Sequence, residues 1–129
     1  MALRKHILVV EDEADLSTLV KVWLERNNYD ISVADNGEDG LNKVYEDNID
    51  LIILDITLPG IDGYEVMRTL KSNPRYSEIP VLMFTADGSG VSQDKAFEAG
   101  ASDYLVKPYE ADMLLYKVKT LLERSKPWR

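Results

Sequence analysis

Five polar residues stand directly after short apolar runs, and their side chains could do chemistry together. They are Glu11, Asp12, Asp55, Thr85 and Lys107. Carboxylates at close range raise each other's pKa, and a divalent cation would offset that repulsion. Oxygen ligands without His or Cys select a hard ion, so Mg²⁺ is expected, with Mn²⁺ as the alternative.

The other two residues fit the handling of a phosphate group. Lys107 offers a fixed positive charge for a phosphate oxygen, and Thr85 offers a hydroxyl donor. A carboxylate can itself act as the nucleophile toward phosphorus. The cation and the lysine would then offset charge on the transferred group. The predicted reaction is phosphoryl transfer onto an aspartate.

The elements that must position these residues alternate along the chain. Buried or half-buried strands are predicted at Ile7–Val10, Tyr29–Val33, Leu51–Leu54, Val81–Phe84 and Tyr104–Val106. Four amphipathic helices are predicted from apolar stripes at helical spacing, and a weaker helix, the fourth in order, is predicted around Ser92–Ala99. The stripes are Leu16, Leu19, Val20, Trp23 and Leu24; Leu41, Val44 and Tyr45; Tyr64, Met67 and Leu70; and Leu114, Val118, Leu121 and Leu122. The fourth helix has a thin apolar face, so we expect it to be the most mobile.

Alternating strands and helices predict an α/β fold with a parallel sheet and helices on both faces. We expect a single doubly wound, five-stranded sheet with five helices, in the flavodoxin-like order 2-1-3-4-5. In that order strands one and three flank a crevice at the carboxyl edge, where such sheets bind ligands. The five polar residues should meet there.

Length and composition narrow the function further. The 129 residues suit one domain, predicted over 1–129 with a frayed tail at 125–129. The chain has no cysteine, which excludes disulfides and thiolate metal sites. A net charge of −8 argues against direct binding to nucleic acid or an anionic membrane. No apolar run approaches the ~20 residues of a membrane helix and no signal peptide is evident, so a cytoplasmic location is expected.

Five sequence strings carry a resemblance to a known family. They are ILVVEDE, LIILDITLPGIDGYEV, PVLMFTA, AGASDY and VKP, which begin at Ile7 and end at Pro108. The resemblance covers residues 6 to about 122. In this order and spacing the chain resembles a response-regulator receiver domain, the CheY-like phospho-accepting part of two-component signalling. The resemblance implies a phosphoprotein switch rather than an enzyme, with only weak self-phosphorylation and autodephosphorylation.

The resemblance also assigns roles to residues around the predicted metal. It implies that Asp55 accepts the phosphoryl group from a histidine kinase or a phosphotransfer protein. It implies that Asp12 and Asp55 bind Mg²⁺ directly, together with the backbone carbonyl of Thr57, and that Glu11 supports the ion through water.

A second group of residues is implied in the switch. Thr85 and Lys107 would contact the phosphoryl group, and Tyr104 matches the aromatic switch residue of the family. A cis Lys107–Pro108 peptide bond is expected, turning the lysine into the crevice. An effector domain or protein would read the face formed by the fourth helix, the fifth strand and the fifth helix.

Three other functions compete with this one. A phosphatase of the haloacid-dehalogenase type also uses an aspartate after an apolar strand, but Thr57 stands where those enzymes place a second aspartate. A flavodoxin-type electron carrier fits the order of elements, but the acidic run Glu11–Glu13 would repel the phosphate of FMN. A degenerate receiver is disfavoured because every matching site position is filled.

Overall fold

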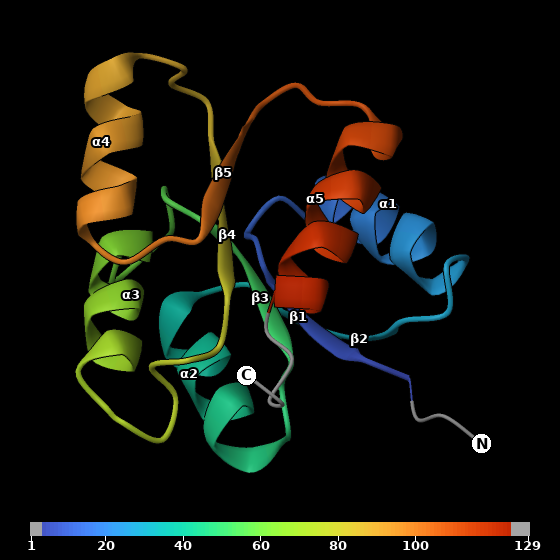
Figure 1. Ribbon diagram of the computed structural model, residues 1–129, viewed down its shortest axis with the longest axis horizontal. Coiled ribbons are helices and arrows are strands. Elements are labelled where there is room, and N and C mark those ends of the chain that lie inside the picture. The colour runs from blue at the N-terminus through green and yellow to red at the C-terminus, as the bar shows by residue number, and fades with distance from the viewer. Residues whose placement is uncertain (1–3, 125–129) are drawn as a thin grey trace.

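The fold is a parallel sheet between two layers of helices (Figure 1). The computed structural model describes residues 4–124. The strands are β1 (His6–Val10), β2 (Asp30–Ala34), β3 (Leu51–Asp55), β4 (Val81–Thr85) and β5 (Asp103–Val106). The helices are α1 (Ala14–Glu25), α2 (Gly37–Glu46), α3 (Gly63–Lys71), α4 (Gly90–Glu98) and α5 (Ala111–Arg124).

All neighbouring strands run parallel, in the order β2-β1-β3-β4-β5. This confirms the predicted doubly wound, flavodoxin-like fold. Because the strands are parallel, their carboxyl ends lie along one edge of the sheet. In the register, Val10 is paired with Leu54, and Asp55 with Phe84. Glu11, which follows β1, therefore lies beside Asp55, the last residue of β3.

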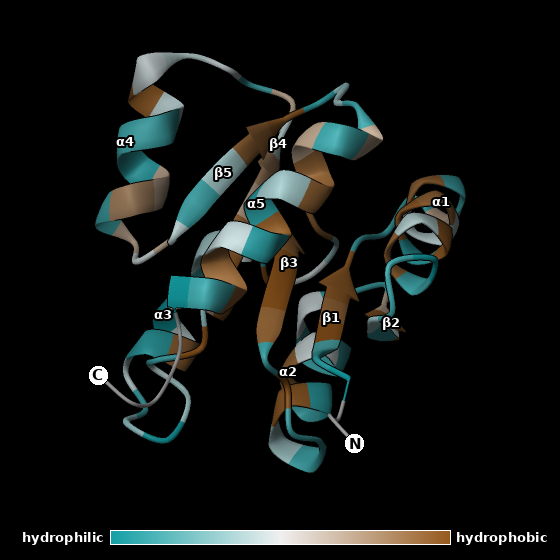
Figure 2. Ribbon diagram, turned by 45° about the vertical axis from the view of Figure 1, so that its right-hand side comes forward, coloured by the Kyte–Doolittle hydropathy of each residue, from teal (hydrophilic) through white to brown (hydrophobic). Residues whose placement is uncertain are grey.

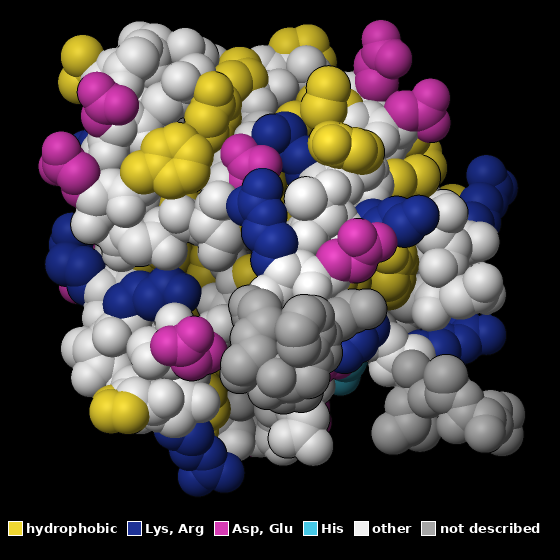
Figure 3. Space-filling view, viewed as in Figure 1, with side chains coloured by type: hydrophobic (Ala, Val, Ile, Leu, Met, Phe, Trp, Pro, Cys, Tyr) yellow, Lys and Arg dark blue, Asp and Glu magenta, His cyan; other side chains and the backbone are white. Residues whose placement is uncertain are grey.

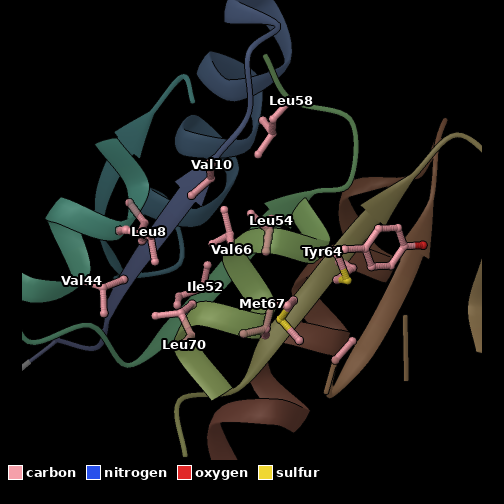
Figure 4. Close-up of a cluster of buried hydrophobic side chains, with 14 of the residues drawn as sticks. Leu8, Val10, Val44, Ile52, Leu54, Leu58, Tyr64, Val66, Met67 and Leu70 are labelled. Atoms are coloured by element: carbon pink, nitrogen blue, oxygen red, sulfur yellow. The ribbon is translucent and has the colours of Figure 1, made fainter. Parts of the chain in front are cut away.

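Side chains alternate between the two faces of the sheet and divide the core into two parts. On β3, Ile52 and Leu54 join a cluster with α2, α3 and Ala96 of α4. Figure 4 shows this cluster from close by. Leu51 and Ile53 join the opposite cluster with α1 and α5. The three central strands, β1, β3 and β4, are thus buried on both faces, whereas the edge strands β2 and β5 are partly exposed. In Figure 2, β1 and β3 are coloured almost uniformly hydrophobic.

The α1 and α4 helices differ in detail from their predicted patterns. On α1 the buried residues are Ser17, Val20 and Leu24, whereas Leu19, predicted to lie on the core stripe, is 44% exposed. The α4 helix begins at Gly90, two residues before the predicted Ser92, because the Ser89 side chain caps its first turn.

The thin apolar face predicted for α4 is confirmed, since Ala96 is its one buried residue. The predicted mobility of this helix stays a prediction. Within residues 4–124, no helix combines the length and apolarity that crossing a membrane requires. The predicted frayed tail, 125–129, lies outside the described residues.

Candidate functional site

The carboxyl edge of the sheet brings together three carboxylates that are far apart in the sequence. Glu11, Asp12 and Asp55 each offer an oxygen, and these oxygens all lie within 4.8 Å of one another. Glu11 and Asp55 are buried, at 1% and 4% exposure, while Asp12 is exposed. The cluster is therefore closed on the protein side and open to solvent at Asp12.

Lys107 enters this cluster from the loop after β5. Its Nζ donates to Oε1 of Glu11 at 2.8 Å and to Oδ2 of Asp55 at 2.9 Å. It also lies 3.7 Å from an oxygen of the exposed Glu13. The peptide bond between Lys107 and Pro108 is cis, as predicted. One ammonium thus bridges two buried carboxylates, as the strand-end argument anticipated.

Burial and charge act in opposite directions on these groups. Burial raises the pKa of Glu11 to about 7; the hydrogen bond from Lys107 lowers it and the neighbouring Asp55 raises it. Burial lowers the pKa of Lys107, but its hydrogen bonds to Glu11 and Asp55 outweigh this, so the net shift is upward. Lys107 therefore stays charged, while three carboxylates against one ammonium leave negative charge in excess. A divalent cation would balance that excess.

The segment after β3 holds Asp55 in place. The backbone N–H of Thr57 donates to Oδ1 of Asp55 at 3.1 Å. The N–H of Gly63, at the start of α3, donates to the carbonyl of Ile56 at 2.8 Å. A Cβ at Gly63 would overlap the carbonyl oxygen of Asp55 and lie 2.8 Å from Cα of Ile56. Only glycine lets α3 begin this close to the aspartate. The predicted role of the Thr57 carbonyl as a metal ligand stays a prediction.

Thr85 is buried at the end of β4, but its hydroxyl group is occupied locally. Oγ1 accepts a hydrogen bond from the N–H of Asp87 at 3.0 Å and donates to the carbonyl of Asp87 at 3.1 Å. The carbonyl of Thr85 accepts from the N–H of Lys107 at 2.7 Å. Thr85 thus ties the two loops at this edge, and contact of its hydroxyl with a phosphoryl group requires the bonds to Asp87 to open.

Tyr104 lies on β5 at the surface, half-buried between α4 and α5. Its ring meets Phe97 edge-on, with centroids 5.6 Å apart. On the other side Lys117 Nζ lies 5.6 Å from the ring centroid and forms a 2.9 Å ion pair with Asp103. Figure 3 shows this face, where hydrophobic side chains are interspersed with charged ones. The exposed hydrophobic residues of α4 and α5 are Val91, Phe97, Met113 and Tyr116.

One residue near the site was missed from the sequence. Tyr109 follows the Lys107–Pro108 pair, and its ring contacts Phe84 of β4 with centroids 4.7 Å apart. Within residues 4–124 its hydroxyl is a buried side-chain polar atom without a hydrogen-bond partner. The sequence feature that could have identified it is a tyrosine directly after the site lysine and a proline.

The chain matches a known protein family over most of its length. The family model described as "Response regulator receiver domain" matches residues 7–119. The chain is 43% identical over 119 residues to the transcriptional regulatory protein ResD of Bacillus subtilis, covering 92% of this chain and 48% of ResD. It is 37% identical over 120 residues to SrrA of Staphylococcus aureus, covering 93% of this chain and 48% of SrrA.

A solved structure agrees with the sequence matches. The receiver domain of Francisella response regulator 1452 superimposes with a TM-score of 0.89 at 28% identity, covering 95% of this chain and 100% of that one. The chain spans about half the length of the curated relatives it matches.

Proposed function

Because this chain belongs to the response regulator receiver domain family, we propose that Asp55 is the residue on which it accepts a phosphoryl group. The chain is the receiver domain of a two-component response regulator, a signalling switch. The donor would be a histidine kinase or a phosphotransfer protein. The observation that carries the assignment to Asp55 is its place among Glu11, Asp12 and Lys107 at the carboxyl edge.

In the proposed transfer a carboxylate oxygen of Asp55 forms a bond to phosphorus. The bond from phosphorus to the donor's histidine nitrogen breaks, and its electron pair stays on the imidazole. The N–H of Thr57 and the ammonium of Lys107 each hold one oxygen of Asp55. These two hydrogen bonds restrict rotation of the carboxylate group and so fix the direction from which it attacks.

The donor set also supports a divalent ion. Glu11, Asp12 and Asp55 present only oxygen, at a spacing that one ion can span. Mg²⁺ binds oxygen ligands and keeps several waters, which the exposed Asp12 side allows. Mn²⁺ would fit the same ligands. When bound, the ion would offset negative charge on the phosphoryl group. Asp12 and Asp55 would be direct ligands with the Thr57 carbonyl, and Glu11 would act through water.

Lys107 would then respond to the new charge. Its ammonium pairs with Glu11 and Asp55 before the reaction, and a phosphoryl oxygen on Asp55 would compete for that ammonium. The hydroxyl of Thr85 would donate to another phosphoryl oxygen after leaving Asp87. We also assign to this site weak self-phosphorylation from small phosphodonors and slow autodephosphorylation.

The output surface would be the face formed by α4, β5 and α5. Tyr104 is held there between Phe97 and Lys117, so movement of Thr85 on the adjacent strand would release it inward. The relatives ResD and SrrA are transcriptional regulatory proteins. We therefore propose that residues 1–129 form a cytoplasmic receiver unit that controls an effector domain or protein. With a charge of −8, the unit itself would not bind nucleic acid or a membrane.

Phosphorylation with acetyl phosphate tests the assignment of Asp55. Intact-mass spectrometry should show one added phosphoryl group in the presence of Mg²⁺ and none with EDTA. Asp55→Asn should gain none, whereas Asp47→Asn, an exposed carboxylate beyond the end of α2, should react like the parent protein. Normal yield for Asp55→Asn would refute the assignment, and normal yield with EDTA would refute the metal requirement.

A further inference from the structure

Tyr109 carries a buried hydroxyl group that the reaction described above does not use. Its ring is fixed between two aromatic residues, with centroid distances of 4.7 Å to Phe84 and 6.4 Å to Trp23. Among residues 4–124, its hydroxyl is buried with no hydrogen-bond partner. A buried polar group without a partner costs free energy, so its presence in a folded protein calls for a physical explanation.

Tyr109 neighbours residues of the carboxylate cluster. Phe84, which its ring contacts, is the register partner of Asp55. Tyr109 also lines one surface groove together with Lys107 and Glu13. Burial, reinforced by the negative charges of Glu11, Asp55 and Glu13, raises the pKa of Tyr109 above its ordinary value. The hydroxyl therefore keeps its proton at neutral pH and is available as a hydrogen-bond donor.

The carboxylate most in need of a donor after phosphorylation is Glu11. Its Oε2 accepts a hydrogen bond from the N–H of Glu13 at 3.1 Å. Among the described residues, Lys107 is the one side chain that donates to its Oε1. A phosphoryl group on Asp55 would attract the same ammonium. Glu11 is 1% exposed, so bulk solvent cannot easily take the place of the lysine. A buried carboxylate that loses its cationic partner is strongly destabilised unless another donor reaches it.

We propose that Tyr109 is a positioning residue of the phospho-acceptor site, whose hydroxyl donates a hydrogen bond to Glu11 when the modified Asp55 draws Lys107 away. This inference rests on the proposed role of Asp55. It gives the unpaired hydroxyl a partner in the phosphorylated state only. The tyrosine would thus favour the modified state without taking part in bond formation.

The test compares Tyr109→Phe, which keeps the ring and removes the hydroxyl, with Tyr116→Phe, whose side chain is 67% exposed on α5. Beryllofluoride, a stable analogue of the phosphoryl group on aspartate, is titrated by calorimetry at saturating Mg²⁺. Tyr109→Phe should bind it roughly 10- to 100-fold more weakly, the size expected for one hydrogen bond to a charged group. Tyr116→Phe should bind like the parent protein. The melting temperature of unmodified Tyr109→Phe should be equal or higher.

Proton NMR gives an independent measure. A slowly exchanging hydroxyl resonance should appear in the beryllofluoride complex of the parent protein and be absent from that of Tyr109→Phe. Equal affinities of Tyr109→Phe and the parent protein would overturn the inference while leaving the role of Asp55 intact. A lower melting temperature of unmodified Tyr109→Phe would also overturn it, by making the hydroxyl a structural group. If Asp55→Asn binds beryllofluoride as well as the parent protein, the proposed function fails and this inference with it.

Discussion

Replacing Lys107 with methionine keeps most of the side-chain volume and removes the charge that bridges Glu11 and Asp55. The two ion pairs measure 2.8 and 2.9 Å, and the carboxylates are 0% and 6% exposed at their side chains. At an effective dielectric constant of about 20, each pair has a Coulomb energy of about 6 kcal/mol. Much of this repays desolvation, and breaking such a buried arrangement by removing one partner costs about 3–5 kcal/mol.

We therefore expect Lys107→Met to fold, but to lose about 3 kcal/mol of unfolding free energy at pH 8 in EDTA. Saturating Mg²⁺ should restore much of the loss, because the ion supplies the missing positive charge. Beryllofluoride should shift the NMR signals of α4 and β5 less than in the parent protein. Urea denaturation followed by circular dichroism, with and without Mg²⁺, measures the unfolding free energies. The matched control is Lys119→Met, since Lys119 is exposed on α5.

The cost should also depend on pH in a defined direction. The pKa of Glu11 is already raised from 4.5 to about 7 in the folded protein. Without Lys107, the hydrogen bond that most lowers the pKa of Glu11 is gone, so Glu11 keeps its proton in the folded state to still higher pH. Between about 4.5 and that raised pKa the folded state binds more protons than the unfolded state, so stability falls as pH rises. Lys107→Met should thus cost less at pH 5 than at pH 8. An equal cost at both pH values, or one no larger than that of Lys119→Met, would refute the reasoning.

Three further predictions concern the surroundings of Asp55. Gly63→Ala should lower the unfolding free energy by about 1–3 kcal/mol, because its Cβ would overlap backbone atoms of residues 55 and 56. Gly90→Ala, which has open space around its Cβ, should not lower it. Urea denaturation of the two variants measures the difference. Asp12→Asn should weaken Mg²⁺ binding in calorimetry by at least roughly tenfold, a loss typical for an altered metal site, and unchanged affinity would remove Asp12 from the ligand set. Thr85→Ala should still be phosphorylated, but its Tyr104 signals should respond less to beryllofluoride, and a full response would dissociate Thr85 from the switch.

The sequence predicts the fold and the composition of the acidic cluster because both depend on regular features. Apolar runs that end in polar residues mark buried parallel strands, and parallel strands place those endings on one edge. Glu11 and Asp55, 44 positions apart in the chain, follow paired residues of β1 and β3. No side-chain geometry was needed for that prediction. The roles of these residues in phosphoryl transfer are tested only by the experiments above.

The exposed Leu19 shows where periodicity alone is insufficient. At about 100° per residue, the buried positions Ser17, Val20 and Leu24 centre on one direction, and Leu19 points about 130° away from it. The apolar stripe read from the sequence was therefore rotated relative to the face that meets the sheet. A small serine can occupy the closest approach to the strands, and its hydroxyl bonds the carbonyl of Ala14 at 3.1 Å. Hydrophobicity identifies the helix, but close packing decides its rotation.

The hydrogen bonds of the site also explain why the switch can be poised between two states. Thr85 must give up its donation to the carbonyl of Asp87 before its hydroxyl reaches a phosphoryl oxygen, a loss of about 1 kcal/mol for a neutral pair. In the proposed switch Tyr104 would leave Phe97 and Lys117, and these contacts are of similarly modest energy. On α4, Ala96 alone is buried, so little packing resists a shift of that helix. Because these costs are small, the charge-assisted contacts that we propose between a phosphoryl group and Lys107 and Thr85 would be large enough to shift the equilibrium.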